Sequence, residues 1–135
     1  MLDWLFGNRV RITKKHTGFV QAVEAIITLQ FTIAQAKPQN FIGNKWVLGY
    51  IYGVNTATLQ NFGIQPSPEA FEYLKDSYTA LYTHRKTGES VLTISMDMRD
   101  NRDFLEGQNI GGNEIVKWTK ESPPQALTLK LMDLK

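Results

Sequence analysis

The pattern of apolar and polar positions predicts two helices with wide apolar faces in the first half of the chain. Across residues 17–37, polar residues fall on one line at helical spacing and apolar residues fill the remainder, until Pro38 ends the helix. Residues 44–62 form a second helix, with Asn44 placed as its cap and Gly63 placed to end it in a left-handed turn. A helix that is apolar over most of its circumference belongs in the middle of a bundle.

Small residues recur at every fourth position of the second helix. Gly49, Gly53 and Ala57 share one side of it. Two interior glycines destabilise a helix by about 1 kcal/mol each relative to alanine, so their presence indicates a compensating contact. We therefore predict that this stripe is a packing surface for a neighbouring helix or a partner chain.

The third predicted helix has the clearest start signal. Ser67 is placed as its cap, Pro68 occupies the first turn, and acidic residues follow where the positive end of the helix dipole lies. Apolar residues recur on one face up to Tyr82, and the basic character of residues 84–86 suits the C-terminus of a helix. The pattern predicts a helix over residues 67–86.

Residues 89–106 fit two patterns. As a helix they stack apolar residues on one stripe, and as a strand they alternate apolar with polar residues. We favour the helix, because a lone strand among helices lacks an evident partner. The candidate partners of a strand are residues 10–13 and 127–131, which also alternate.

The C-terminal quarter predicts short helices after a loop. Residues 107–112 are rich in glycine and predict a loop, and Asn113 is placed to cap a short helix through Lys120. The capping-box spacing that begins at Ser122 favours a last helix.

These elements predict an all-α fold, an antiparallel bundle of four longer helices with one or two short helices at the C-terminus. The alternative is an α+β fold with short strands near 9–13, 91–98 and 126–132. A length of 135 residues, with 42% hydrophobic and 21% charged residues, indicates one globular domain over residues 1–135. We divide it into a basic N-terminal arm (1–16), a helical bundle (17–106) and a segment of short C-terminal helices (107–135).

Composition excludes several kinds of site. The chain has no cysteine, so disulfides, thiolate metal sites and cysteine nucleophiles are excluded. This absence fits a reducing compartment, and the first residues do not resemble a secretory signal, so we expect a cytoplasmic protein. Residues 17–36 carry one charge, yet the glutamines and threonines among them disfavour a membrane span.

A cluster of basic residues near the N-terminus is a candidate binding feature. Arg9, Arg11, Lys14 and Lys15 could bind phosphate groups or an anionic membrane surface. A net charge of +2 gives little support to nucleic-acid binding, and termini are often tied down by packing on their own domain. We therefore do not expect nucleic acid or a membrane surface to be the partner.

The candidate metal and catalytic patterns are incomplete. Asp97, Asp100 and Asp103 would line one face of a helix, but interleaved arginines favour a charged solvent face over a metal site. His16 and His84, the two histidines, lack the carboxylate three residues earlier that di-iron bundles use. The sequence therefore predicts no catalytic residue, no metal and no cofactor.

Two amides lie among apolar residues at helical spacing, Gln30 in the first helix and Asn55 in the second. A buried amide must be hydrogen-bonded, so we expect both side chains to be structural. The alternative is a ligand-binding interior in which Gln30, Asn55, Tyr50 and Tyr78 contact a small molecule.

The function that these features favour is a non-enzymatic interaction or assembly module. Small-residue packing, wide apolar faces and abundant tyrosine indicate association. A homo-oligomer, first of all a dimer, is the expected assembly, and a different protein is the other candidate partner. The alternative function is a small-molecule-binding helical bundle, with or without enzymatic activity, that uses an interior lined by Tyr, Gln and Asn.

Overall fold

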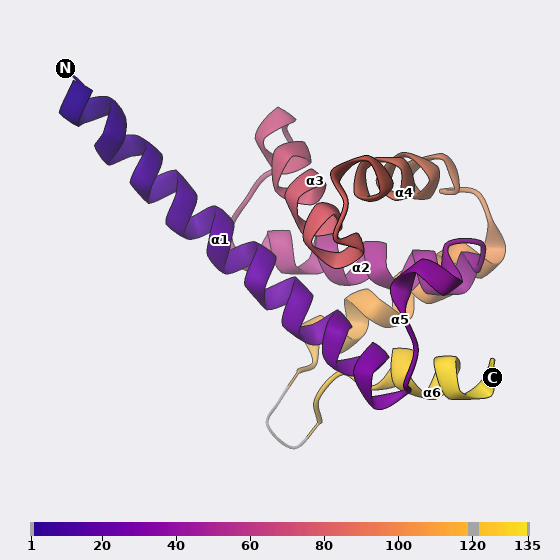
Figure 1. Ribbon diagram of the computed structural model, residues 1–135. Helices are drawn as coiled ribbons and strands as arrows, with labels where there is room; N and C mark the ends of the chain where they lie inside the picture. Colours follow the sequence, from indigo (N-terminus) through magenta and orange to yellow (C-terminus); the bar gives the residue numbers. More distant parts are fainter. Residues whose placement is uncertain (1, 119–121, 135) are drawn as a thin grey trace.

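The computed structural model describes residues 2–118 and 122–134, with side chains described from residue 15 onward. Within this part every regular element is helical and no strand is present (Figure 1). In chain order the elements are α1 (Leu2–Ile33), the 3-10 helix η1 (Pro38–Phe41), α2 (Lys45–Asn61), α3 (Pro68–Tyr82), α4 (Arg85–Asp97), α5 (Arg102–Val116) and α6 (Ala126–Asp133). The predicted all-α class is confirmed, and the segments considered as strands lie in or beside α1, α4 and α6.

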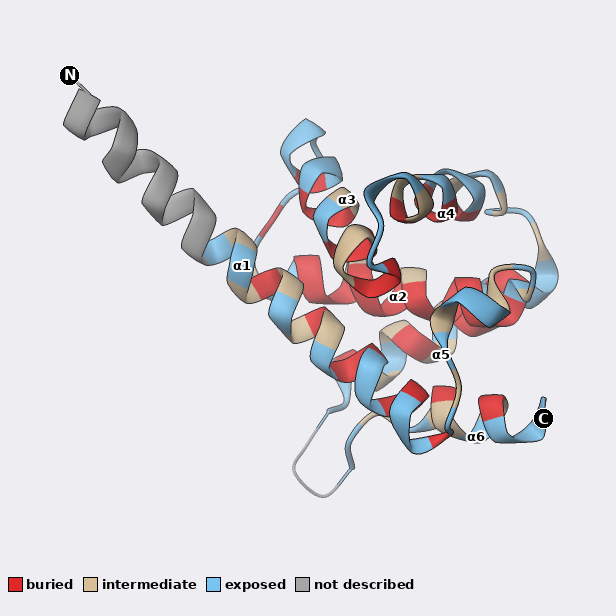
Figure 2. Cartoon of the chain, viewed as in Figure 1, coloured by how far each residue is buried: buried red, intermediate tan, exposed pale blue. Residues whose placement is uncertain are grey.

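Helix α2 lies at the centre of the fold. It contacts α1, α3, α4, α5 and α6, and its residues are buried along nearly its whole length (Figure 2). Its most extensive contact is with α5, whereas α3 and α4 pack chiefly on each other. Because neighbours surround α2, its broad apolar face has the partners that the hydrophobic pattern requires.

Helix α1 lies at the edge of the fold, not in its middle. Phe19, Val23 and Ile27 are fully buried against the other helices, whereas Leu29 is 59% and Ile33 58% exposed. The expectation that this helix is surrounded by others is therefore wrong, because its apolar circumference is wider than the face that its neighbours cover (Figure 2). The helix also begins at Leu2, so it includes the segment expected to be a separate basic arm.

Local capping signals fix two helix starts as predicted. The Asn44 side chain accepts a hydrogen bond from the Val47 N–H at 2.9 Å and caps α2. Ser67 caps α3 by accepting from the Ala70 N–H at 3.2 Å. Gly63 has a positive φ of 71°, which lets the chain turn sharply after α2.

Two predicted helix boundaries around α4 are wrong. Helix α3 ends at Tyr82 instead of residue 86, because Thr83 adopts a left-handed φ of 63°. Helix α4 then runs over Arg85–Asp97, so residues 89–106 are not one helix.

Helix α5 occupies the segment predicted as a loop over 107–112. Asn101 caps this helix by accepting a backbone hydrogen bond at 3.1 Å. Gly107 and Gly111 inside it lie against α2, so contact with α2 outweighs the weak helix propensity of glycine. The predicted division between residues 106 and 107 therefore falls inside a helix, and the short helix expected from Asn113 is the last turn of α5.

Candidate functional site

The first candidate residue, Gln30, belongs to a hydrogen-bond network that links four helices. Its side-chain amide donates to the Tyr50 hydroxyl at 2.9 Å, and its carbonyl oxygen accepts from the Thr128 backbone N–H at 3.0 Å. The Tyr50 hydroxyl donates to the Glu114 carboxylate at 2.5 Å. The network thus joins α1, α2, α5 and α6 through side chains that are far apart in the sequence.

Glu114 anchors the start of α6. Its carboxylate accepts from the Gln125 N–H at 3.0 Å and from the Ala126 N–H at 3.2 Å. A negative charge at a helix N-terminus satisfies donors that the helix leaves free and interacts favourably with its dipole. Burial raises the pKa of Tyr50 well above its ordinary value, and the adjacent carboxylate raises that pKa further.

Asn55, the second candidate amide, ties α2 to α3. Its Nδ2 donates to the Ile51 carbonyl at 2.8 Å, and its Oδ1 accepts from the Ser77 hydroxyl at 2.6 Å. Ser77 is buried and lies on α3. Both polar ends of this amide are therefore occupied by groups of the protein itself.

All four residues considered for ligand contact lie in the protein interior. Gln30 is 2% exposed, and Asn55, Tyr50 and Tyr78 are fully buried. Burial raises the pKa of Tyr78 well above its ordinary value. The ring of Tyr78 stacks with the ring of Tyr82, and the two centroids are 6.3 Å apart. In this conformation the four side chains contact other parts of the chain and present no surface to solvent.

The predicted small-residue stripe lies against α5. A Cβ atom added to Gly49 would come within 2.0 Å of the Phe104 carbonyl oxygen, and one added to Gly53 within 2.2 Å of the Gln108 carbonyl oxygen. Gly107 and Gly111 face α2 in the same way, with the nearest backbone oxygens at 2.1 and 2.5 Å from an added Cβ. The backbones of α2 and α5 thus meet directly through glycines of both helices, and Ala57 is buried further along α2.

The structure separates the three candidate aspartates, and most of the basic cluster lies outside the residues whose side chains are described. Arg9, Arg11 and Lys14 lie outside the residues whose side chains are described, and Lys15 is exposed. The three aspartates expected on one helical face are separated, because Asp97 ends α4, Asp100 lies in the connection and Asp103 begins α5. Over the described residues, no three His, Asp or Glu side chains form a group able to hold a metal ion.

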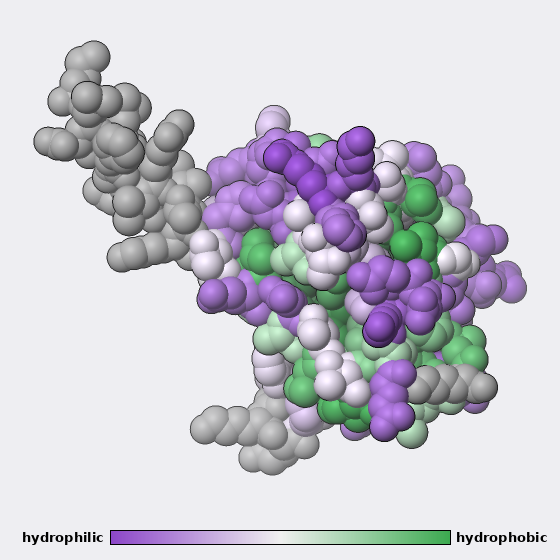
Figure 3. Space-filling model, viewed as in Figure 1, coloured by the Kyte–Doolittle hydropathy of each residue, from purple (hydrophilic) through white to green (hydrophobic). Residues whose placement is uncertain are grey.

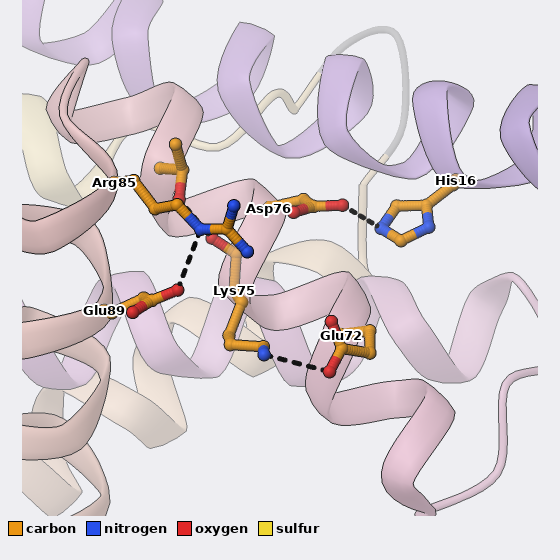
Figure 4. A network of polar contacts seen from close by, with 7 residues as sticks. His16, Glu72, Lys75, Asp76, Arg85 and Glu89 are labelled. Atoms are coloured by element: carbon orange, nitrogen blue, oxygen red, sulfur yellow. Dashed lines mark hydrogen bonds and ion pairs between the residues drawn. The ribbon is translucent and has the colours of Figure 1, made fainter.

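His16 makes a polar contact between α1 and α3. Its Nε2 lies 2.7 Å from the Asp76 carboxylate (Figure 4). Its ring stacks on that of Tyr73, with the centroids 4.1 Å apart. Figure 4 also shows a Glu72–Lys75 pair, which like the Arg85–Glu89 pair joins residues of one helix at the surface. The histidine contact is therefore a helix-to-helix contact, whereas the other two pairs are local.

The outer face of α1 combines part of the polar line predicted for this helix with apolar residues that its neighbours leave uncovered. We define it by its exposed residues Gln21, Ala25, Thr28, Leu29, Thr32 and Ile33. None of these six is charged, and Glu24 at the border is partly buried. A shallow groove of about 410 Å³ runs along the helix, and its lining consists of Glu24 and all of the six exposed residues except Ile33.

Further exposed apolar side chains lie on α6, which packs against α1. Leu129 is 61% and Met132 58% exposed. Figure 3 shows hydrophobic residues gathered in the lower part of that view, in the region of the C-terminal half of α1 and of α6. Exposed apolar side chains thus occur on both α1 and α6, and others lie elsewhere, such as Val116 on α5, which is 72% exposed.

Comparisons with known proteins do not indicate a function for this chain. No protein-family model matches the chain, and neither a curated protein nor a solved structure matches it. Within the described part of the chain, no helix combines the length and apolar character that crossing a membrane requires.

Proposed function

We propose that this protein is a non-enzymatic assembly module that forms a homodimer through the outer face of α1. The observation that carries the proposal is the exposure of Leu29 and Ile33 on a helix face whose exposed residues over 21–33 carry no charge, with the half-buried Glu24 at its border. A face of a surface helix that meets water normally carries charged and polar residues. Exposed apolar side chains grouped on one face mark a place where another surface can bind.

The shape of this face suits a second helix. Ala25, Thr28 and Thr32 are small, and the shallow groove between them and Leu29 can receive the ridge of side chains on a facing helix. Helices that pack in this way approach to about 8–10 Å between their axes.

A second copy of the same chain is the partner that we propose. In a twofold dimer the same patch meets itself, so the patch must not repel its own copy. The six exposed residues of the α1 outer face carry no charge, and the one carboxylate that lines its groove, Glu24, is half-buried at the border of the face. The small net charge of +2 adds little repulsion between two copies. The absence of cysteine supports a cytoplasmic location for this dimer.

Sedimentation equilibrium at micromolar concentrations tests the proposal, with two matched variants. Thr28→Arg places a charge in the centre of the face, and Thr93→Arg makes the same change at an exposed helical threonine of α4. We expect a dimer for the parent and for Thr93→Arg, and a shift towards monomer for Thr28→Arg. A parent protein that is monomeric throughout, or equal dissociation of both variants, would contradict the proposal.

A further inference from the structure

A second concave surface lies away from the α1 outer face, between α2, the turn that follows it, α3 and the end of α4. It is a groove of about 530 Å³, which we name the α2–α4 groove. Ligand pockets for small molecules measure about 300–1,000 Å³, so the groove is of the right size for one such molecule.

The buried part of this groove is apolar. Leu59, Ile64 and Leu74 are buried at its base, and three larger side chains form its walls, namely Tyr52, Phe71 and Met96. Tyr52 and Phe71 supply aromatic surface, and methionine adapts its shape to a bound molecule. Contact with such walls favours a flat or aliphatic apolar molecule.

The absence of charged residues in the lining indicates which kind of molecule the groove can bind. No residue that lines the α2–α4 groove is charged. An ionised group buried against these apolar side chains would lose hydration, which is unfavourable. The ammonium group of Lys75, beside the groove, lies 5.3 Å from the centre of the Phe71 ring and is already paired with Glu72.

Besides Tyr52, the polar residues of the lining are Gln60, Gln65 and Ser67, which are exposed, and Thr56, which is half-buried; all of them are neutral. The Ser67 hydroxyl already accepts from the Ala70 N–H and donates to the Gln65 carbonyl.

We infer that the α2–α4 groove binds an uncharged, mainly apolar small molecule whose polar atoms are limited to its solvent-facing edge. This ligand differs from the one considered for the interior, since Gln30, Asn55, Tyr50 and Tyr78 do not line this groove. The inference is independent of dimer formation, because no residue of the α1 outer face contributes to the groove.

A pair of fluorescent probes with the same ring system tests the predicted chemistry. N-phenylnaphthylamine is neutral, and anilinonaphthalenesulfonate carries an added sulfonate. We expect saturable binding of the neutral probe at one site, and binding of the anionic probe weaker by about tenfold or more, as expected when an ion is placed in an apolar site. The net charge of +2 favours the anionic probe, so electrostatic attraction to the whole protein would give the opposite order. Anionic binding as tight as neutral binding would overturn the inference.

Two variants of matched exposure locate the probe. Phe71→Ala removes a wall of the groove, and Ile94→Ala removes an apolar side chain that does not line it; these residues are 38% and 37% exposed. We expect the neutral probe to bind about tenfold more weakly to Phe71→Ala, and unchanged to Ile94→Ala, because only the first loses contact area. Equal effects of the two substitutions would contradict the proposed location.

Methyl NMR spectra of the unmodified protein locate the probe without any substitution. Met96 lines the groove, whereas Met132 is exposed on α6. On titration with N-phenylnaphthylamine, the Met96 methyl signal should shift and saturate together with the fluorescence, while that of Met132 stays in place. An unmoved Met96 signal at saturation would place the probe elsewhere and overturn the inference.

Discussion

The contact between α2 and α5 should make Gly53 intolerant of the smallest side chain. In Gly53→Ala the added Cβ would lie 2.2 Å from the Gln108 carbonyl oxygen, which is far inside van der Waals contact. That oxygen belongs to the backbone of α5, so a side-chain rotation cannot relieve the clash. The two helices must separate, and the contacts on both sides of the glycine must loosen with them.

Gly112→Ala is the matched control for this substitution. An added Cβ at Gly112 would lie 3.7 Å from the nearest atom, the Gly53 carbonyl oxygen, which is ordinary contact. Both substitutions replace a helical glycine with alanine and share the gain in helix propensity of about 1 kcal/mol. The difference between the variants therefore isolates the clash, which should cost roughly 1–3 kcal/mol, as overpacking of a core does.

Urea unfolding followed by circular dichroism measures this difference. We expect Gly112→Ala to be as stable as the parent or slightly more stable, and Gly53→Ala to be less stable than Gly112→Ala by ~1–3 kcal/mol with a similar dependence on urea. Equal stability of the two variants would refute the direct backbone contact between α2 and α5.

Two further predictions concern the buried polar groups. Burial raises the pKa values of Tyr50, Tyr78 and Tyr82 above the ordinary 10.0. The stability that these buried, neutral tyrosines contribute is therefore complete below pH 10.0 and is lost as the pH rises above it. Each of these tyrosines should lower the free energy of unfolding by about 1.4 kcal/mol per pH unit once it ionises in the unfolded chain. Urea unfolding followed by tyrosinate absorbance should show that these rings ionise only when the protein unfolds. Titration of all tyrosines in the folded state would contradict this. Glu114→Ala removes the acceptor at the start of α6 and should destabilise by about 1–2 kcal/mol, with faster hydrogen exchange in α6 than elsewhere; unchanged exchange there would show that the carboxylate does not hold this helix.

Local signals in the sequence predicted some of the features that depend on neighbouring residues, although Asn113 lies inside α5 and α6 begins without a side-chain cap. Asn44 and Ser67 cap the helices they were expected to cap, since a cap requires only the residue and the turn that follows it. Gln30 and Asn55 are buried, as the apolar residues around them on each helix predict.

Features that depend on distant residues were not predicted. Glycines over 107–112 favour a loop when considered alone, and only their contact with α2 explains why α5 is helical there. Glu114 lies 64 residues from Tyr50 and Thr128 lies 98 residues from Gln30, so no local pattern indicates either hydrogen bond. The sequence indicated that the apolar faces are wide, but not that the uncovered part lies on α1, because the hydrophobic pattern shows how apolar a helix is and not how many neighbours cover it.

The measurement that tests the proposed dimer most directly is disulfide crosslinking on the cysteine-free chain. Single cysteines at Ala25, Thr28 and Thr32 would follow the centre of the α1 outer face, and Thr93→Cys is a control at an exposed position of α4. Two cysteines form a disulfide only when their Cα atoms come within about 7 Å, so a twofold contact through α1 should crosslink rapidly at one or more of these positions. The account predicts covalent dimers from the α1 positions under mild oxidation and only slow, concentration-dependent dimers from Thr93→Cys. Equal crosslinking from α1 and α4, or none from α1, would contradict the proposal that α1 forms the dimer.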